Sequence, residues 1–200
     1  MATIVEAWAG GPLAEQANLL LIGGDLASPS ADESEQLAAM DAIIPAADRV
    51  SRGLLLAGHQ PNDTAARWVA AARFGIPGLV APRGVYVCGS LKEEFGIALL
   101  EAMASGLFVV APAGGGPATY VQQGVTGVLA PTWDLALFRS AMSTAMETAA
   151  AETDDERAAM SRATVEDSFT IQAMAQSLNE VYDAVKQAQV SLQGWVVSTS

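Results

Sequence analysis

Two glutamates that flank a Phe-Gly pair are the residues of this sequence best suited to bind a ligand. Glu93 and Glu101 stand eight positions apart, and Glu101 falls in an apolar stretch typical of a helix. A lone acid in so apolar a helix is costly unless something pairs with it. Because a carboxylate accepts hydrogen bonds from two vicinal hydroxyls, we expect Glu101 to bind a ligand. The alternatives are that Glu101 pairs with a basic residue or faces water, and that Glu93 is simply solvated.

The start of the same helix predicts a site for an anion. The Phe95-Gly96 turn leads into the helix, and the first amides of any helix lack partners within it. Such amides, together with the helix dipole, attract a phosphate without any basic side chain. The donors expected here are the backbone amides of Gly96, Ile97 and Ala98.

Other residues carry a weaker signal. Gly115 and Gly116 lie in a tight turn where the backbone can approach a ligand closely, although a plain strand-to-helix turn explains them equally well. The turn matches neither the dinucleotide fingerprint nor a P-loop. The single histidine, His59, contacts a base or phosphate or makes local hydrogen bonds. The single cysteine, Cys88, is most simply a buried small side chain.

Five short apolar runs indicate the strands that position these residues. They are residues 19–22, 54–57, 85–88, 108–111 and 127–130. Continuous apolar runs that end at small residues are typical of parallel strands buried on both faces. Helical patterns lie between them, so we expect an α/β fold, a Rossmann-like parallel sheet flanked by helices. Ligands bind at the carboxyl ends of such strands.

Helical spacing predicts further elements at both ends of the chain. Apolar residues recur at helical spacing within residues 135–146, with Asp134 as N-cap, and within residues 171–185 after a break. The second stripe needs a surface to pack against. Residues 1–8 resemble the middle of an amphipathic helix, which in an open parallel sheet follows a strand. We therefore expect the sheet to lack its first strand, either because the chain starts there or because an upstream segment is missing.

Composition narrows the classes of function. The net charge of −12 would be repelled by nucleic acid or an anionic membrane. One cysteine excludes an internal disulfide, and one histidine excludes a metal site with two histidine ligands. No apolar run approaches the roughly 20 residues that span a bilayer. We expect a cytoplasmic protein with no metal site, no nucleic-acid partner and no membrane anchor.

Taken together, these residues resemble the C-terminal half of the retaining GT-B glycosyltransferases of family 4, the group that includes sucrose synthase and sucrose-phosphate synthase. The Glu-x7-Glu signature of that family, in which Glu-x-Phe-Gly opens a helix and Glu-Ala-Met follows, is matched by residues 93–103. Further segments fit in the same order: residues 104–107, 109–111, 115–117, 124–127 and Pro131. We assign residues 1–190 to this donor-binding domain, incomplete at its N-terminus, and residues 191–200 to a tail.

The resemblance implies a role for each matching residue. Glu101 would bind the ribose hydroxyls of a nucleotide-diphosphate sugar, and Glu93, the catalytic candidate, would contact the donor sugar. The other residues that the resemblance places in this site are Phe95, Gly96, Ile97, Ala98, Gly115 and Gly116. The hexosyl group would be transferred with retention of configuration and without cofactor or metal, because donors already in place stabilise the leaving diphosphate.

The sequence departs from the family at three points. Glu94 replaces a residue that is often small, and Thr119 stands where a glutamate often follows the glycine turn. No Arg or Lys precedes Arg49, so the two cations that the family supplies to the diphosphate are absent, as is the N-terminal domain that binds the acceptor. We expect weak nucleotide-sugar binding, negligible transfer by the chain alone, and a separate N-terminal GT-B domain as partner.

A non-catalytic interaction module, or a subunit of a split enzyme that keeps the fold, is the alternative. In that case the last helix and the apolar residues after it would dock a partner; those residues are Leu192, Trp195, Val196 and Val197. A sugar-nucleotide epimerase of the same fold fits less well, because the motifs follow the glycosyltransferase order.

Overall fold

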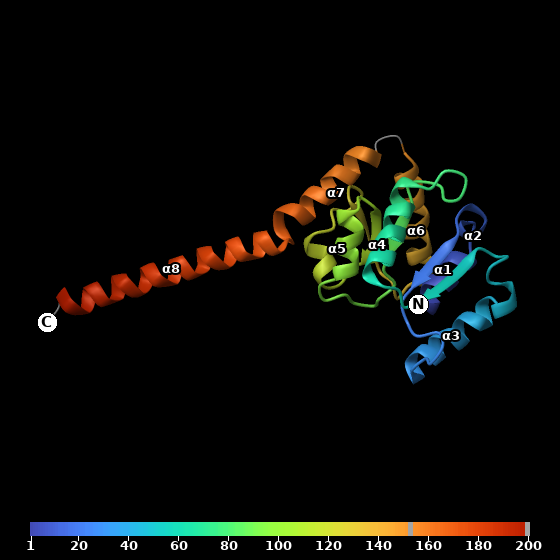
Figure 1. Cartoon of the computed structure of the whole chain (residues 1–200), viewed down its shortest axis with the longest axis horizontal. Helices are drawn as coiled ribbons and strands as arrows, with labels where there is room; N and C mark the ends of the chain where they lie inside the picture. Colours follow the sequence, from blue (N-terminus) through green and yellow to red (C-terminus); the bar gives the residue numbers. More distant parts are fainter. Residues whose placement is uncertain (152–153, 199–200) are drawn as a thin grey trace. The chain divides into compact units, whose positions relative to one another are not determined.

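Five parallel strands form where the apolar runs of the sequence predict them. The computed structural model describes residues 1–151 and 154–198, and the chain divides into two units, Met1–Arg162 and Ala163–Ser200 (Figure 1). The strands are β1 (Leu19–Ile22), β2 (Leu54–Gly58), β3 (Val85–Val87), β4 (Phe108–Pro112) and β5 (Gly127–Ala130). Their bounds agree with the predicted runs to within one residue.

Helices connect these strands and extend to the C-terminal part of the chain. They are α1 (Ala2–Ala9), α2 (Leu13–Gln16), α3 (Ala31–Ile43), α4 (Asn62–Phe74), α5 (Ile97–Ala104), α6 (Leu135–Ala150), α7 (Asp154–Ser168) and α8 (Ile171–Ser198). Two short 3-10 turns are η1 (Ala46–Asp48) and η2 (Gly116–Thr119). The predicted α/β class is thereby confirmed.

The strands form two parallel sheets rather than one. The first sheet has the order β1-β2, and the second has the order β3-β4-β5. Leu19 is opposite Leu54 in the first sheet, and Val110 is opposite both Val87 and Val128 in the second. In the described residues, β1 and β3 each pair on one side only, which agrees with the expectation that the sheet lacks a strand.

One apolar core covers a single face of both sheets. Buried residues of α1 and α6 pack in the same cluster as Leu54 of β2 and Val110 of β4. Phe138, on α6, is fully buried at its centre. Asp134 caps α6 as predicted, since its Oδ1 accepts a hydrogen bond of 3.0 Å from the amide of Leu137. The two sheets are therefore joined by their helices although their strands are not paired.

The opposite face of the two sheets is covered unevenly. Helix α5 packs against β4, whose Val109 and Ala111 are fully buried. On the first sheet Leu20 and Leu55, which are opposite each other, are both 40% exposed. Among the described residues, this face of the first sheet thus keeps an apolar surface that is partly exposed.

Within the unit Ala163–Ser200, α8 carries the predicted apolar stripe, and its side chains are exposed. They are Ile171, Met174, Leu178, Val181 and Val185. The predicted docking residues Leu192, Trp195, Val196 and Val197 lie outside the part of the chain whose side chains are described. Among the described residues, no helix is both long enough and apolar enough to cross a membrane.

Candidate functional site

A glycine opens α5 and leaves its first amides available. Gly96 adopts a positive φ of 81° as the N-cap of α5, and no side chain caps the helix. The first helical hydrogen bond runs from the amide of Leu100 to the carbonyl of Gly96, at 3.0 Å. The amides of Ile97 and Ala98 therefore have no acceptor within the helix, as the sequence predicts. The N-terminus of α5 therefore combines unpaired amide donors with the positive end of the helix dipole.

Glu101 lies on the exposed face of α5. The expectation of a costly acid inside an apolar helix is wrong, because the helix buries only one side, through residues such as Leu99 and Met103. In the part of the chain that the structure describes, no hydrogen bond or ion pair engages the Glu101 carboxylate. Ile97, one turn earlier, is 66% exposed on the same side. Glu101 is accessible to a ligand held at the helix start.

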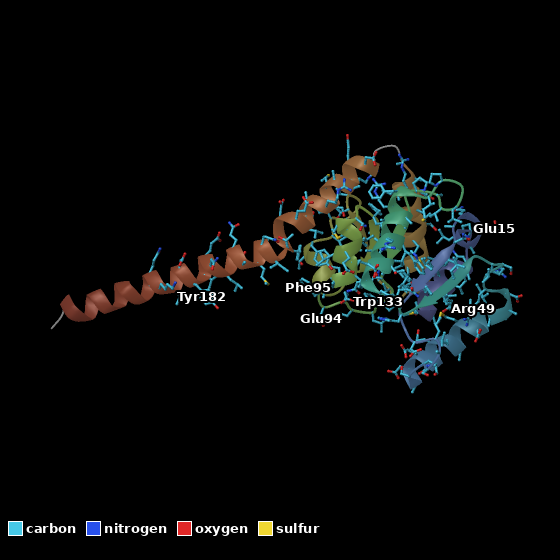
Figure 2. All side chains as sticks on the ribbon, in the orientation of Figure 1. Glu15, Arg49, Glu94, Phe95, Trp133 and Tyr182 are labelled. Atoms are coloured by element: carbon cyan, nitrogen blue, oxygen red, sulfur yellow. The ribbon has the colours of Figure 1, made fainter. Side chains whose placement is uncertain are left out.

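The loop before α5 is also accessible to solvent. Phe95 is 52% exposed, and Glu94 forms an exposed ion pair of 2.7 Å with Lys92 (Figure 2). Glu94 and Lys92 are thus surface residues, whereas Glu93 is half-buried.

Backbone contacts hold Glu93 against the glycine turn. The carbonyl of Glu93 accepts a hydrogen bond of 2.9 Å from the amide of Gly116, and Glu93 forms a parallel bridge with Gly115. A Cβ atom on Gly115 would collide with the Glu93 carbonyl, and one on Gly116 with the Glu94 carbonyl. These glycines therefore position the Glu93 loop by close packing. Cys88 Sγ lies 4.0 Å from Glu93 Oε2 behind it.

Tyr120 fixes the same loop from the other side, and no motif in the sequence pointed to it. Its hydroxyl donates a hydrogen bond of 2.6 Å to the carbonyl of Phe95, and the residue is 5% exposed. Burial, and then the charges of Glu93 and Cys88, raise the pKa of the Tyr120 phenol to about 12. The phenol therefore stays neutral and donates at physiological pH.

Replacing Tyr120 with phenylalanine is expected to lower the free energy of unfolding by about 1 kcal/mol at pH 7, because one buried hydrogen bond is lost. The folded pKa is raised, so the contribution is complete below the ordinary tyrosine value and is lost only as the pH rises through the folded one. Urea unfolding should give the same difference at pH 7 and pH 9. Tyr182→Phe, at the exposed Tyr182, is the control; a difference that fades between these pH values would contradict the assignment.

Tyr86 brings both glutamates into one electrostatic environment. Burial raises the pKa of this phenol above its usual range, and the charges of Cys88, Glu93 and Glu101 raise it further. Tyr86 lies on β3, an edge strand of the second sheet, so Glu93 and Glu101 both act on one side chain of this strand.

The loop after β1 is engaged in contacts of its own. The carboxylate of Asp25 accepts hydrogen bonds from the amides of Ala27 and Ser28, which lower the pKa of Asp25, as does the nearby His59. Glu33 accepts from Ser30 and Asp25, which lowers the pKa of Glu33. His59 is exposed near Asp25, and both of its expected roles stay predictions.

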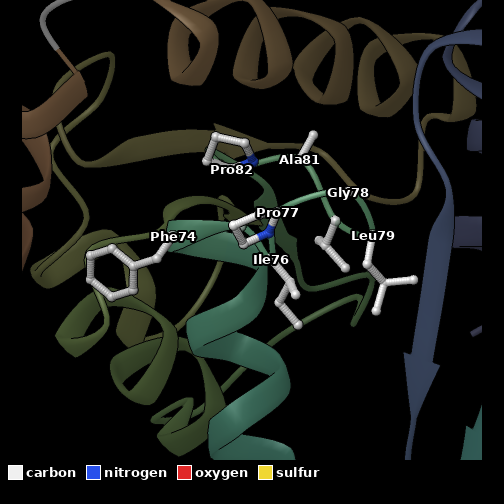
Figure 3. A pocket seen from close by; sticks show the side chains of 9 residues that line it. Phe74, Ile76, Pro77, Gly78, Leu79, Ala81 and Pro82 are labelled. Carbon is white, nitrogen blue, oxygen red and sulfur yellow. The ribbon is translucent and has the colours of Figure 1, made fainter.

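Two further features lie apart from these residues. A hollow of about 570 Å³ is lined by the loop from Phe74 to Pro82 and contains none of the predicted site residues (Figure 3). Within residues 1–151 and 154–198, no group of three or more His, Cys, Asp or Glu side chains could hold a metal ion.

Parallel sheets flanked by helices, with a glycine-opened helix at their carboxyl edge, define a Rossmann-like α/β domain. Residues 72–166 match the family described as glycosyl transferases group 1, a stretch that contains α5, the glycine turn and β5. The match covers just under half of the chain, and the fold is that of a GT-B C-terminal domain.

Sucrose synthases are similar to this chain in sequence. The enzyme of Acidithiobacillus caldus is 35% identical over 120 residues, and that of Denitrovibrio acetiphilus is 37% identical over 125 residues. These matches cover 56% and 58% of this chain, respectively, but only 14% of either relative. The chain therefore corresponds to a small part of these proteins.

Solved structures share the fold over most of the chain. Sucrose-phosphate synthase from Thermosynechococcus elongatus has a TM-score of 0.71 and 25% identity, and the match covers 94% of this chain and 42% of that one. Anabaena Alr3699/HepE, solved in complex with UDP, has a TM-score of 0.69 and 21% identity over 91% of this chain and 44% of its own. The second likeness is one of fold alone.

Proposed function

We propose that this chain is the donor-binding half of a retaining hexosyltransferase and that it binds a nucleotide-diphosphate sugar at the start of α5. The observation that carries the proposal is the exposed carboxylate of Glu101 one turn beyond the open amides of Ile97 and Ala98. The match of residues 72–166 to glycosyl transferases group 1 supports a sugar nucleotide as the ligand.

The diphosphate binds at the amino end of α5. Its negative charge is stabilised by the amides of Gly96, Ile97 and Ala98 and by the positive end of the helix dipole. Because Gly96 has no side chain, the diphosphate can approach these amides closely. Such donors are already oriented before the reaction, so they also stabilise the charge that develops on the leaving diphosphate.

Glu101 selects the nucleotide by its ribose. Residues four apart on a helix share a face, so a ligand with its phosphate near Ile97 places the adjoining ribose near Glu101. The carboxylate accepts hydrogen bonds from both ribose hydroxyls, and charge-assisted bonds of this kind are stronger than neutral ones. Phe95 adds an exposed apolar surface beside the same ligand.

Glu93 contacts the donor sugar on the other side of the diphosphate. The glycine turn and Tyr120 hold the Glu93 loop in place, so its carboxylate is oriented with little loss of freedom on binding. Transfer retains the anomeric configuration. An acceptor-binding N-terminal GT-B domain completes the site, and the chain alone transfers negligibly.

Replacing Glu101 with alanine is expected to weaken binding of a nucleotide-diphosphate sugar about 10- to 100-fold, since hydrogen bonds to a charged group contribute about 1.5–3 kcal/mol. Calorimetry with UDP-, GDP- and ADP-glucose at millimolar concentrations measures the affinity and identifies the base. Glu94→Ala is the matched control, because Glu94 is exposed and, among the described residues, forms an ion pair with Lys92 at the surface.

Three results would count against the proposal. Equal affinity of Glu101→Ala and the unaltered chain would show that Glu101 does not bind the ligand. No binding of any sugar nucleotide at millimolar concentration would show that the proposed site does not exist. Measurable transfer by the isolated chain would contradict its inactivity. Both variants should unfold at the same urea concentration as the parent, because both glutamates are exposed.

The exposed stripe of α8 favours a second candidate, a non-catalytic interaction module. Five apolar side chains along one helix face are more than single surface residues and mark a contact surface. This candidate predicts that no sugar nucleotide binds and that Glu101→Ala changes nothing. The same calorimetric series therefore separates the two functions.

A further inference from the structure

We propose that a hollow between α3 and β2 binds a neutral molecule that has an alkyl chain and a carbonyl group, with the side chain of Arg49 as its anchor (Figure 2). This hollow belongs to the first sheet, whereas the proposed sugar-nucleotide site lies at the start of α5, which packs against the second sheet. The inference therefore does not depend on the proposed function.

The hollow is elongated and follows β2. It has a volume of about 370 Å³. Arg49 lines it before the strand begins, and Leu54 and Leu56 line it from one face of the strand, since they are two positions apart. Leu26 lines it where the strand ends, because the Cγ atom of Leu26 would lie 3.1 Å from a Cβ atom on Gly58. One end of the hollow is thus polar and the other is apolar.

The polar end contains a buried donor without an acceptor. The Arg49 side chain is 14% exposed, and its Nη2 donates a hydrogen bond of 2.7 Å to Oδ1 of Asp41 on α3. Among the described residues, no group accepts a hydrogen bond from the buried Nε of Arg49. A buried polar group without a partner is costly, and the leucine side chains of the hollow offer no acceptor. The Nε–H group is therefore available to an acceptor atom of a ligand.

The rest of the hollow suits an alkyl chain. Leu54 is buried at its floor and Leu37 of α3 is half-buried at its wall, whereas Leu26 and Val50 are 45% and 74% exposed. An alkyl chain that follows β2 removes these exposed side chains from water and is itself removed from water. Each methylene group buried in this way strengthens binding about fourfold.

Charge favours a carbonyl group over a carboxylate as the acceptor. The guanidinium charge of Arg49 is already balanced by Asp41, and the whole chain has a net charge of −12. A second carboxylate beside that of Asp41 would be repelled. A carbonyl oxygen accepts the hydrogen bond from Nε–H and brings neither a charge nor a donor that the leucine side chains would leave unpaired.

The test is an NMR titration of the full chain with 2-octanone. Saturable shifts are expected at millimolar concentration for the Nε–H signal of Arg49 and for the backbone amide of Leu56. Two further probes define the ligand: 2-pentanone has the same carbonyl group on a shorter alkyl chain, and octanoate has a similar chain with a charge. Each should bind about 10-fold more weakly than 2-octanone, or worse.

Two pairs of variants locate the ligand, and both are followed at the backbone amides. Arg49→Met removes the donor and is expected to weaken binding of 2-octanone about 10-fold or more. Arg67→Met is its control, because Arg67 forms an exposed ion pair of 3.1 Å with Asp63 away from the hollow. Ala46→Phe places a ring in the hollow and should prevent binding. Ala47→Phe, at the next exposed residue, which does not line the hollow, should not.

Each outcome bears on the proposal. Weaker binding by Arg49→Met and Ala46→Phe, with both controls unchanged, supports it. The absence of saturable shifts with 2-octanone overturns it, as does equal affinity of Arg49→Met and Arg67→Met. Tighter binding of octanoate than of 2-octanone overturns the neutral ligand. If Ala46→Phe binds as well as Ala47→Phe, the ketone lies elsewhere and the proposal is wrong.

Discussion

Replacing Gly115 with alanine is expected to lower the free energy of unfolding by about 2–4 kcal/mol, through backbone strain and overpacking together. Gly115 has a φ of 95°, which is unfavourable for a residue with a side chain, and the new Cβ would collide with the carbonyl of Glu93. Relief requires the Glu93 loop to move away from the turn. Urea unfolding measures the stability, and calorimetry with a nucleotide-diphosphate sugar measures the expected loss of affinity.

Gly114 provides an unusually close control for this substitution. No atom lies within 4 Å of a Cβ placed on Gly114, and its φ is not in the strained range. Gly114→Ala should therefore match the parent chain in both measurements. Equal behaviour of Gly115→Ala and Gly114→Ala would show that the Glu93 loop does not depend on close packing against the turn.

Phe138→Ala is expected to lower the free energy of unfolding by about 3–5 kcal/mol, since a fully buried aromatic side chain leaves a cavity when truncated. Phe138 lies at the centre of the core that joins both sheets, and its ring also approaches the position of a Cβ on Gly89 at 3.7 Å. Losing the ring therefore weakens contacts to α1 as well as to the strands. The shift of the urea midpoint measures the loss.

Leu137→Ala removes a neighbouring side chain of the same helix and serves as the control. Leu137 is 54% exposed, and its backbone amide, which Asp134 caps, is unaffected by the substitution. Its cost should be below about 1 kcal/mol. If Phe138→Ala cost no more than Leu137→Ala, the two sheets would not share a core centred on α6. The expected cost of Phe138→Ala approaches the total free energy of unfolding of many domains. Phe138→Leu should therefore be measured as well, because it removes less of the side chain and costs less.

The strands could be predicted because the sequence indicates each of them by two features, a continuous apolar run and a small residue or proline at its end. The run at residues 108–111 is continuously apolar and ends at Pro112, and the strand observed is fully buried. A strand that is buried on both faces is apolar at every position, so no alternation of polar and apolar residues has to be recognised. A proline or glycine then marks the end of the strand. The helix at residues 1–8 predicts that the sheet lacks a strand, since an open parallel sheet supplies a strand before such a helix. The division of the five strands into two sheets was not predicted.

The site was predicted less completely, because its geometry depends on contacts distant in sequence. The sequence identifies α5 and its open amides, but a helix of apolar composition does not tell which side it buries, so the exposure of Glu101 was predicted only as an alternative. The packing of Gly115 on Glu93 and the hydrogen bond from Tyr120 to Phe95 join segments more than twenty residues apart. Neither periodicity nor turn chemistry encodes such pairings.

The single thiol of this chain stands directly behind the candidate site. Cys88 follows β3, is 9% exposed, and lies 4.0 Å from a carboxylate oxygen of Glu93. Because Cys88 is the one cysteine among the 200 residues, a thiol reagent can modify this side chain alone. The rate at which the reagent modifies Cys88 therefore measures how often the Glu93 loop opens. This measurement needs neither a partner nor a turnover assay.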